Sequence, residues 1–121
     1  MRLHLEDLET GRQSNGGRIW LELGAESFPE EGWYDLPGVL LEIWKSGLES
    51  FFLGNTDSCE LQFMDGPYRV RLRREGEQVS TVCLEQNRVR IPETQIDLPE
   101  FCDSVKKCVR YYERMQYLST K

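Results

Sequence analysis

The side chains that could carry catalytic chemistry are few and scattered in this 121-residue chain. His4 is the only histidine, and it stands close to the first residue. The four cysteines show neither a CxxC spacing nor a neighbouring histidine, so the sequence predicts neither a zinc site nor a Cys–His nucleophile. Glu30 and Glu31 are adjacent carboxylates between Pro29 and Gly32, where solvated loop acids are more common than a general acid–base pair. We therefore predict no enzyme, no catalytic residue, no metal ligand and no cofactor.

The cysteines fit a reduced interior. Cys59 and Cys83 fall in strand-like runs, whereas Cys102 and Cys108 share one helical pattern, at a spacing that keeps their side chains too far apart for a disulfide. Free cysteine behaves as a small hydrophobe, so buried thiols are predicted. No apolar run is long enough to span a membrane, and the alternating, acid-bearing start is not typical of a signal peptide. The expectation is a cytoplasmic protein without membrane contact.

Charge is distributed unevenly along the chain. Residues 22–60 hold nine acids against Lys45 alone, a net charge of −8, although the whole chain has a net charge of −6. The segments 1–21 and 61–121 have net charges of 0 and +2. Such a concentrated negative field repels nucleic acid and anionic lipid and attracts basic partners.

A predicted helix lies in the middle of this acidic segment. An aromatic-rich loop over residues 24–34 leads into it, with Asp35 as the expected N-cap and Pro37 in the first turn. Its predicted buried stripe, with apolar residues mostly three and four positions apart, comprises Val39, Leu40, Ile43, Trp44, Leu48, Phe51 and Phe52. Glu42 and Glu49 fall on the opposite side, which we expect to lie beside the Glu30–Glu31 loop.

Period-two patterns predict the strands, which are expected at 3–6, 18–23, 58–64, 68–74 and 78–86, with a short extended piece at 89–91 ended by Pro92. A turn is expected at 11–17, and a second helix from about Leu98 to Met115 after a cap at Asp97. The sequence therefore predicts one α+β domain over residues 1–121. Its mostly antiparallel sheet of five to six strands carries two helices on one face, in the order β-β-α-β-β-β-α.

The loop after the strand at 58–64 is predicted from proline chemistry. Pro67 lacks the amide hydrogen that a two-residue turn at Asp65-Gly66 requires. A wider loop from Met64 to Pro67, closed by a Phe63–Tyr68 pair, is therefore expected.

Arginines form a second candidate surface. Arg69, Arg71 and Arg73 alternate with apolar residues along one strand and could follow a phosphate backbone. The simpler interpretation is that they pair with acids such as Glu60 and Glu85 on neighbouring strands. Nucleic-acid binding through this face is the third-ranked function.

Five landmarks stand out along the chain: the Ile19-Trp20-Leu21 strand, Phe28-Pro29, Trp33 with Asp35, a helix carrying Trp44, and the Phe63–Tyr68 hairpin. Together they resemble small bacterial immunity proteins, which are encoded beside polymorphic or contact-dependent toxins. The resemblance covers roughly residues 19–72 and the final helix. It implies a non-enzymatic protein that neutralises a cognate toxin domain, such as a nuclease, by covering its basic surface.

The residues predicted to bind such a partner are carboxylates and aromatic side chains around the first helix: Glu26, Glu30, Glu31, Trp33, Tyr34, Asp35, Glu42 and Glu49. Trp33 could instead seal the loop over the helix start. The alternative function is a housekeeping interaction or self-associating module without a toxin, pairing through an edge strand at 3–9 or 88–91. The chain is expected to be a monomer or a weak homodimer.

Overall fold

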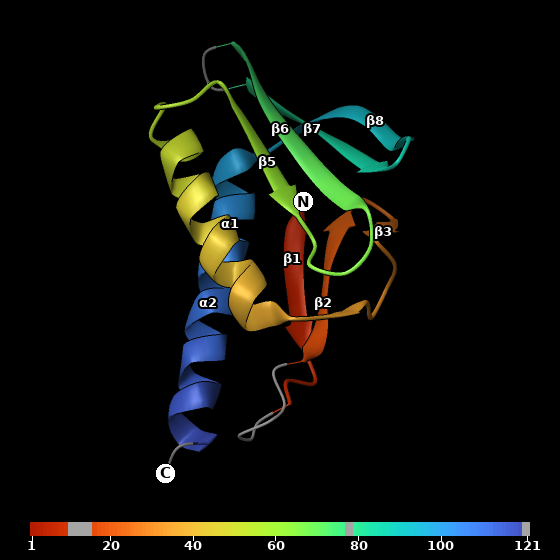
Figure 1. The fold of residues 1–121 in the computed structure, drawn as a ribbon. Helices are drawn as coiled ribbons and strands as arrows, with labels where there is room; N and C mark the ends of the chain where they lie inside the picture. Colours follow the sequence, from red (N-terminus) through yellow and green to blue (C-terminus); the bar gives the residue numbers. More distant parts are fainter. Residues whose placement is uncertain (10–15, 77–78, 120–121) are drawn as a thin grey trace.

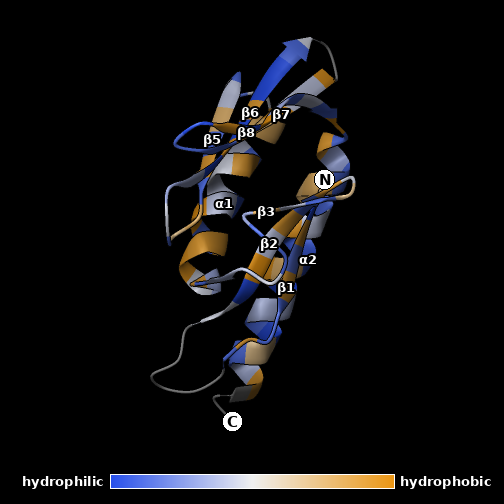
Figure 2. Ribbon diagram, turned by 90° about the vertical axis from the view of Figure 1, so that its right-hand side faces the viewer, coloured by the Kyte–Doolittle hydropathy of each residue, from blue (hydrophilic) through white to orange (hydrophobic). Residues whose placement is uncertain are grey.

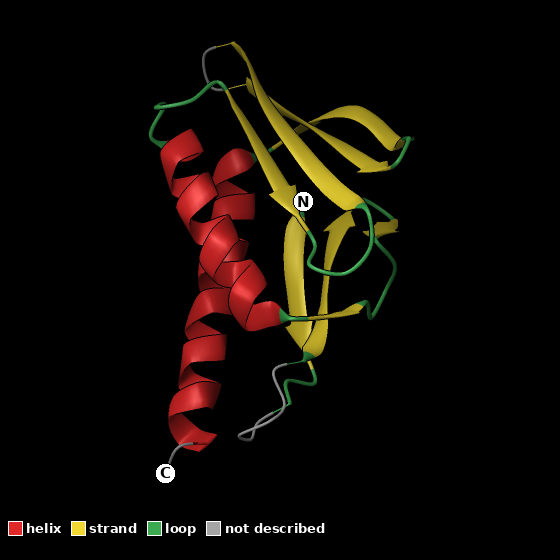
Figure 3. Ribbon diagram, viewed as in Figure 1, coloured by secondary structure: helices red, strands yellow, loops and turns green. Residues whose placement is uncertain are grey.

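The computed structural model describes residues 1–9, 16–76 and 79–119. Two helices lie on one side of the molecule and two sheets on the other (Figure 1, Figure 3). In chain order the elements are β1 (Arg2–Glu6), β2 (Gly17–Leu23), β3 (Glu26–Phe28), β4 (Tyr34–Asp35), α1 (Pro37–Phe52), β5 (Ser58–Gln62), β6 (Tyr68–Gly76), β7 (Val79–Gln86), β8 (Val89–Ile96) and α2 (Leu98–Ser119). The α+β class is confirmed. Most of the turn expected at 11–17 lies outside the described residues.

The strands form two antiparallel sheets, whereas a single sheet was predicted. The first sheet has the order β1-β2-β3, with β4 also paired to β2, and the second has the order β5-β6-β7-β8. The expected loop over 24–34 contains two short strands, because Gly24 turns the chain at a φ of 60° and lets β3 pair back onto β2. The first sheet is thus completed before α1 begins, and β5 starts a second one.

Each helix packs mainly against one sheet. Helix α2 lies on β1, α1 lies on β5, and the two helices contact each other. They approach closely where α1 starts, because a Cβ on Gly38 would overlap the hydroxyl of Tyr112. Among the described residues, no helix combines the length and the apolarity that a bilayer crossing requires.

The core joins both sheets and both helices. Its largest fully buried side chains are Trp44, Phe28, Phe51 and Phe101, with Ile19 and Leu21 from β2 and Leu61, Val70, Leu72, Val82 and Leu84 from the second sheet. Figure 2 shows apolar stretches on both helices and along β2. The indole Nε1 of Trp44 donates to the backbone oxygen of Gln62 at 2.8 Å, so the polar atom of this buried ring is satisfied.

The predicted buried stripe of α1 is only partly correct. Leu40, Trp44, Leu48 and Phe51 are buried as expected. The prediction is wrong for Val39, Ile43 and Phe52, which are 49%, 52% and 48% exposed. Pro37 and Leu41 are buried instead. Apolar residues surround most of this helix, so their spacing did not define which arc contacts both α2 and β5.

The turn chemistry was predicted more accurately. The Phe63 amide donates to the Tyr68 oxygen at 3.1 Å, which closes the Met64–Pro67 loop, and Gly66 adopts a φ of 75°. Asp97 caps α2, since its Oδ1 accepts the Glu100 amide at 3.1 Å.

Strand β8 continues through Pro92, where an end was expected. It is the last strand of the second sheet, and its pairing with β7 is irregular between Val82 and Leu84. Proline is tolerated in an edge strand at such a position, because no ladder hydrogen bond depends on its nitrogen.

Candidate interaction surface

Asp35 is a buried structural carboxylate, and it does not lie on a surface where a partner could bind it. Asp35 is only 2% exposed to solvent. One oxygen, Oδ2, accepts the Trp33 indole N–H at 3.0 Å and the amides of Met64 and Asp65 at 3.1 and 3.3 Å. The other, Oδ1, accepts the amide of Leu36 at 2.7 Å. Asp35 therefore ties β4 to the β5–β6 loop.

The expected capping role of Asp35 is also wrong. Leu36 is the N-cap residue of α1, and no side chain caps this helix. The carboxylate points instead to the loop that follows β5, because three N–H groups converge there and a buried carboxylate needs such donors.

The two aromatic candidates lie in different environments. Trp33 is half-buried, and its ring meets Tyr68 edge-on at a centroid distance of 4.9 Å. Its indole N–H donates to Asp35 and its ring packs against the core, which agrees better with a structural role for Trp33 than with a fully exposed binding residue. Tyr34 is half-exposed, and its hydroxyl donates to Glu9, a hydrogen bond that raises the pKa of the phenol. Of the two, Tyr34 has the larger surface for a partner.

The remaining carboxylate candidates are exposed, but they form two separate groups. Glu26 lies in β3, and Glu30 and Glu31 lie in the loop that follows it, whereas Glu42 and Glu49 lie on α1. In Figure 1, β3 is at the right of the molecule and α1 at the left, with the sheets between them. The expected single acidic edge is therefore wrong, because the chain crosses the molecule between β3 and α1.

Apolar side chains accompany the acids on α1. Leu36, Val39 and Ile43 are exposed at positions i, i+3 and i+7, which lie along one side of a helix. With Glu42 and Glu49 they make up what we call the outer face of α1. Their helical spacing predicted Val39 and Ile43 as core residues, so the apolar part of this surface was not predicted from the sequence. A helical projection that placed Leu41 in the core and Ile43 in solvent would have revealed this apolar surface.

The exposed candidate acids form no ion pairs. No ion pair joins Glu26, Glu30, Glu31, Glu42 or Glu49 to any residue in the described ranges, although eight ion pairs are present there. Their carboxylates therefore make no close contact with a base, although Lys45 lies between Glu42 and Glu49 on α1. Exposed charges of this kind contribute little to folding and remain free to act on a partner.

The arginine face of β6 and β7 is neutralised internally. Arg69 Nη2 and Arg71 Nη1 lie 3.2 and 3.0 Å from the two oxygens of Glu85, which is 8% exposed. Arg69 also lies 3.6 Å from Glu60. The hydrogen bond to Glu85 raises the pKa of the Arg71 guanidinium. The predicted pairing with Glu60 and Glu85 is confirmed.

Arg73 completes this network at the far end of the strand. Its Nη2 lies 2.6 Å from Glu75 and 3.5 Å from Glu93 on β8. Each arginine of the stripe therefore has an acidic partner, which argues against a phosphate-binding surface.

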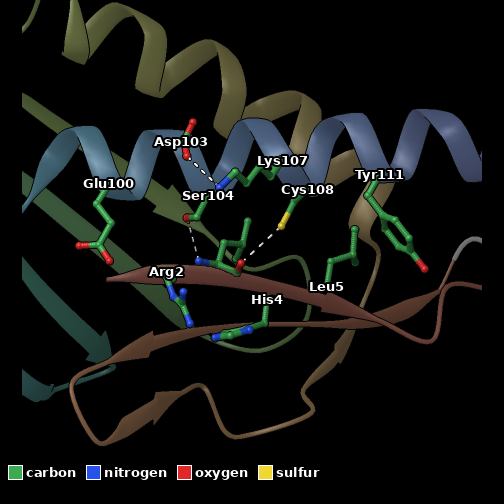
Figure 4. A pocket seen from close by; sticks show the side chains of 10 residues that line it. Arg2, His4, Leu5, Glu100, Asp103, Ser104, Lys107, Cys108 and Tyr111 are labelled. Carbon is green, nitrogen blue, oxygen red and sulfur yellow. Dashed lines mark hydrogen bonds and ion pairs between the residues drawn. The ribbon is translucent and has the colours of Figure 1, made fainter.

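A pocket of about 430 Å³ between β1 and α2 brings together the most reactive residue types. Figure 4 shows Cys108 and Ser104 of α2 above β1, with His4 below the strand. Ser104 Oγ accepts the Leu3 amide at 3.0 Å, and Cys108 Sγ donates to the Leu3 oxygen at 3.4 Å. His4 instead stacks on Trp20 and lies 2.9 Å from Glu22. No Cys–His pair forms here, and α2 closes the β1 edge at Leu3.

The thiols are poor nucleophiles. All four cysteines are free, and burial raises the pKa of Cys59 and of Cys108 to about 11. Thiolate, not thiol, is the reactive species, so these groups stay protonated and inert near neutral pH. Within the described part of the chain, no group of three metal-binding side chains is present.

No protein-family model, curated protein or solved structure matches this chain. The resemblance to immunity proteins therefore stays a prediction. What the structure defines is an α+β fold with a neutralised arginine face and an acidic, partly apolar helix face.

Proposed function

We propose that this chain is a non-enzymatic, acidic binding protein of the immunity type. It would act in the cytoplasm by covering the basic surface of a cognate toxin domain. The observation that supports this proposal is the cluster of exposed acids over residues 26–49, which form no ion pair within the described residues, whereas the arginines of β6 are paired with acids. Unpaired surface acids steer a basic partner and gain their counter-charges only on binding.

The outer face of α1 has the composition of an interface. Its apolar residues, Leu36, Val39 and Ile43, would form the centre, and Glu42 would lie at the rim. A matching partner presents an apolar contact surrounded by lysine and arginine. Tyr34, which precedes the helix and is half-exposed, could extend the contact.

Co-expression with the C-terminal domain encoded by the neighbouring open reading frame tests the proposal. That domain should be toxic alone, and this chain should both restore growth and co-purify with it. A harmless domain, or one that this chain does not retain, would remove the immunity role. Retention of a basic but non-toxic partner would leave only the alternative, a housekeeping interaction module.

Charge reversal locates the binding face. Glu42→Lys should weaken the complex by about tenfold or more, mainly through slower association, because a rim charge acts on the on-rate. Glu100→Lys is the matched control, since Glu100 is also an exposed helical glutamate without an ion pair in the described residues, but it lies on α2. Equal weakening by both variants would mean that net charge, and not the outer face of α1, governs binding.

A further inference from the structure

A groove of about 460 Å³ lies between α1 and α2, and Glu49 is the residue that it shares with the outer face of α1. The helices approach closely at Gly38 and Tyr112, and the groove is lined by the second half of α1, from Lys45 onward. Its walls include buried or half-buried apolar side chains from both helices: Leu48, Cys102, Val105 and Val109. The floor is therefore apolar, as in grooves that receive a helix or an apolar side chain.

Two large apolar residues border the open end of this groove. Phe52 is 48% exposed and Leu53 is 65% exposed, and they are adjacent in the chain. Exposed apolar side chains next to an apolar groove form a contiguous patch, which marks an interaction site more often than single exposed residues do.

The rim of the groove carries both signs of charge. Its charged residues are three bases and two acids: Lys45, Lys106, Arg110, Glu49 and Glu113. None of them forms an ion pair with another residue that the structure describes. The net charge here is +1, in contrast to −6 for the whole chain.

We propose that the α1–α2 groove binds a second copy of this chain. A two-fold interface places one patch against itself, so the patch must be self-complementary. An apolar floor, protruding Phe52 and Leu53, and unpaired charges of both signs meet that requirement. The groove rim, with more bases than acids, would repel the basic partner proposed for the outer face of α1, so a basic protein is a poor occupant.

This inference does not rest on the proposed function, because Leu36, Val39, Glu42 and Ile43 of the outer face of α1 do not line the groove and only Glu49 borders both surfaces. One dimer could therefore present two outer faces to partners. The net negative charge of each copy opposes association, so a weak dimer is expected, with a Kd on the order of 10–100 µM.

Sedimentation equilibrium of the purified chain tests the inference directly. Between about 1 and about 500 µM, a range that brackets the expected Kd, the average mass should rise from 14.2 kDa toward that of a dimer. A constant monomer mass over this range would overturn the proposal, and the groove would then be open to an unlike partner.

Two variants locate the interface. Leu53→Glu places a charge at the groove lip, and Arg110→Glu reverses the sign of the α2 rim; each should raise the dimer Kd by about tenfold. Ile43→Glu is the matched control, because Ile43 is a similarly exposed apolar residue of α1 outside the groove. It should leave the Kd within about twofold.

Which substitutions disrupt the dimer decides whether the groove is its interface. A dimer that survives Leu53→Glu and Arg110→Glu, or that Ile43→Glu disrupts equally, would contradict the groove as the interface. Circular dichroism of each variant must match the wild type, and the exposed positions of Leu53 and Arg110 make correct folding the expected outcome.

Discussion

The outer face of α1 and the arginine face of β6 and β7 both carry strong charge, but they satisfy it differently. On β6, Arg69 and Arg71 share Glu85, and Arg73 meets Glu75 and Glu93. On α1, Glu42 and Glu49 have no ion-pair partner among the described residues and lie near exposed apolar side chains. A stripe of like charges in the sequence is therefore not a binding site by itself. Only charges without partners in the fold are free for another molecule.

Alanine substitutions on the buried and the exposed side of α1 should give the largest difference in the free energy of unfolding. Leu40→Ala should lower the free energy of unfolding by about 2–5 kcal/mol, because it leaves a cavity in the core. Ile43→Ala should lower it by less than about 1 kcal/mol, because its side chain is already half in water. Urea denaturation of both variants measures this. A comparable loss in each would mean that Ile43 belongs to the core and that the outer face of α1 is misassigned.

Two acids of the same segment, one buried and one exposed, should also differ in their contribution to the free energy of unfolding. Asp35→Ala leaves the Trp33 indole and the amides of Met64 and Asp65 without their acceptor, and should cost about 2–4 kcal/mol of unfolding free energy. Glu42→Gln should change it by less than about 0.5 kcal/mol. Thermal unfolding compares the two. If Asp35→Ala is as stable as Glu42→Gln, the carboxylate is not the anchor that its contacts indicate.

Removing Glu85 should make the arginine face resemble a nucleic-acid surface. Glu85→Gln deprives Arg69 and Arg71 of their shared carboxylate and should cost about 1–2 kcal/mol, since both guanidinium groups remain partly solvated. The wild type should pass through a heparin column at low salt, and the variant should be retained longer. Strong retention of the wild type would instead support the nucleic-acid function.

High pH should act on the core behind the arginine face and not on the outer face of α1. Burial raises the pKa of Cys59 on β5 to about 11, above its value in the unfolded chain. A raised folded-state pKa means that the stabilising contribution is complete below the unfolded value and is lost as the pH rises toward about 11. The free energy of unfolding should therefore fall over this range by about 1 kcal/mol, less than the full pKa shift implies, because the Cys59 thiol is only partly buried.

Replacing the thiol isolates that contribution. Cys59→Ala should flatten the alkaline decline measured by urea titration at several pH values. An unchanged slope would show that other groups, such as the tyrosines, account for it.

The fold could be predicted where the signal is local. The Met64–Pro67 loop follows from the missing amide hydrogen of Pro67, and the cap at Asp97 follows from its carboxylate and the amide of Glu100. The pairing of the arginines with Glu60 and Glu85 followed from strand neighbours. Each of these features depends on residues close in sequence or directly across one strand pair.

The division into two sheets could not be predicted, because β3 and β4 are only three and two residues long and pair with β2. Strands this short carry too few alternating positions for a pattern. The candidate site was divided for the same reason, since β4 carries the chain from Glu30 and Glu31, which follow β3, across the molecule to α1 and Glu42.

The sequence by itself determined the charge asymmetry, the reduced cysteines, the α+β class and the local turns, because each depends on residue type or short-range geometry. Tertiary structure alone decided which charges remain unpaired and which apolar residues of α1 face water. Asp35 shows the reason most clearly. Its partners Met64 and Asp65 are about thirty positions away, so only packing could convert an apparent surface acid into a buried anchor. The same packing turned Val39 and Ile43 outward, next to the acids that a partner would meet.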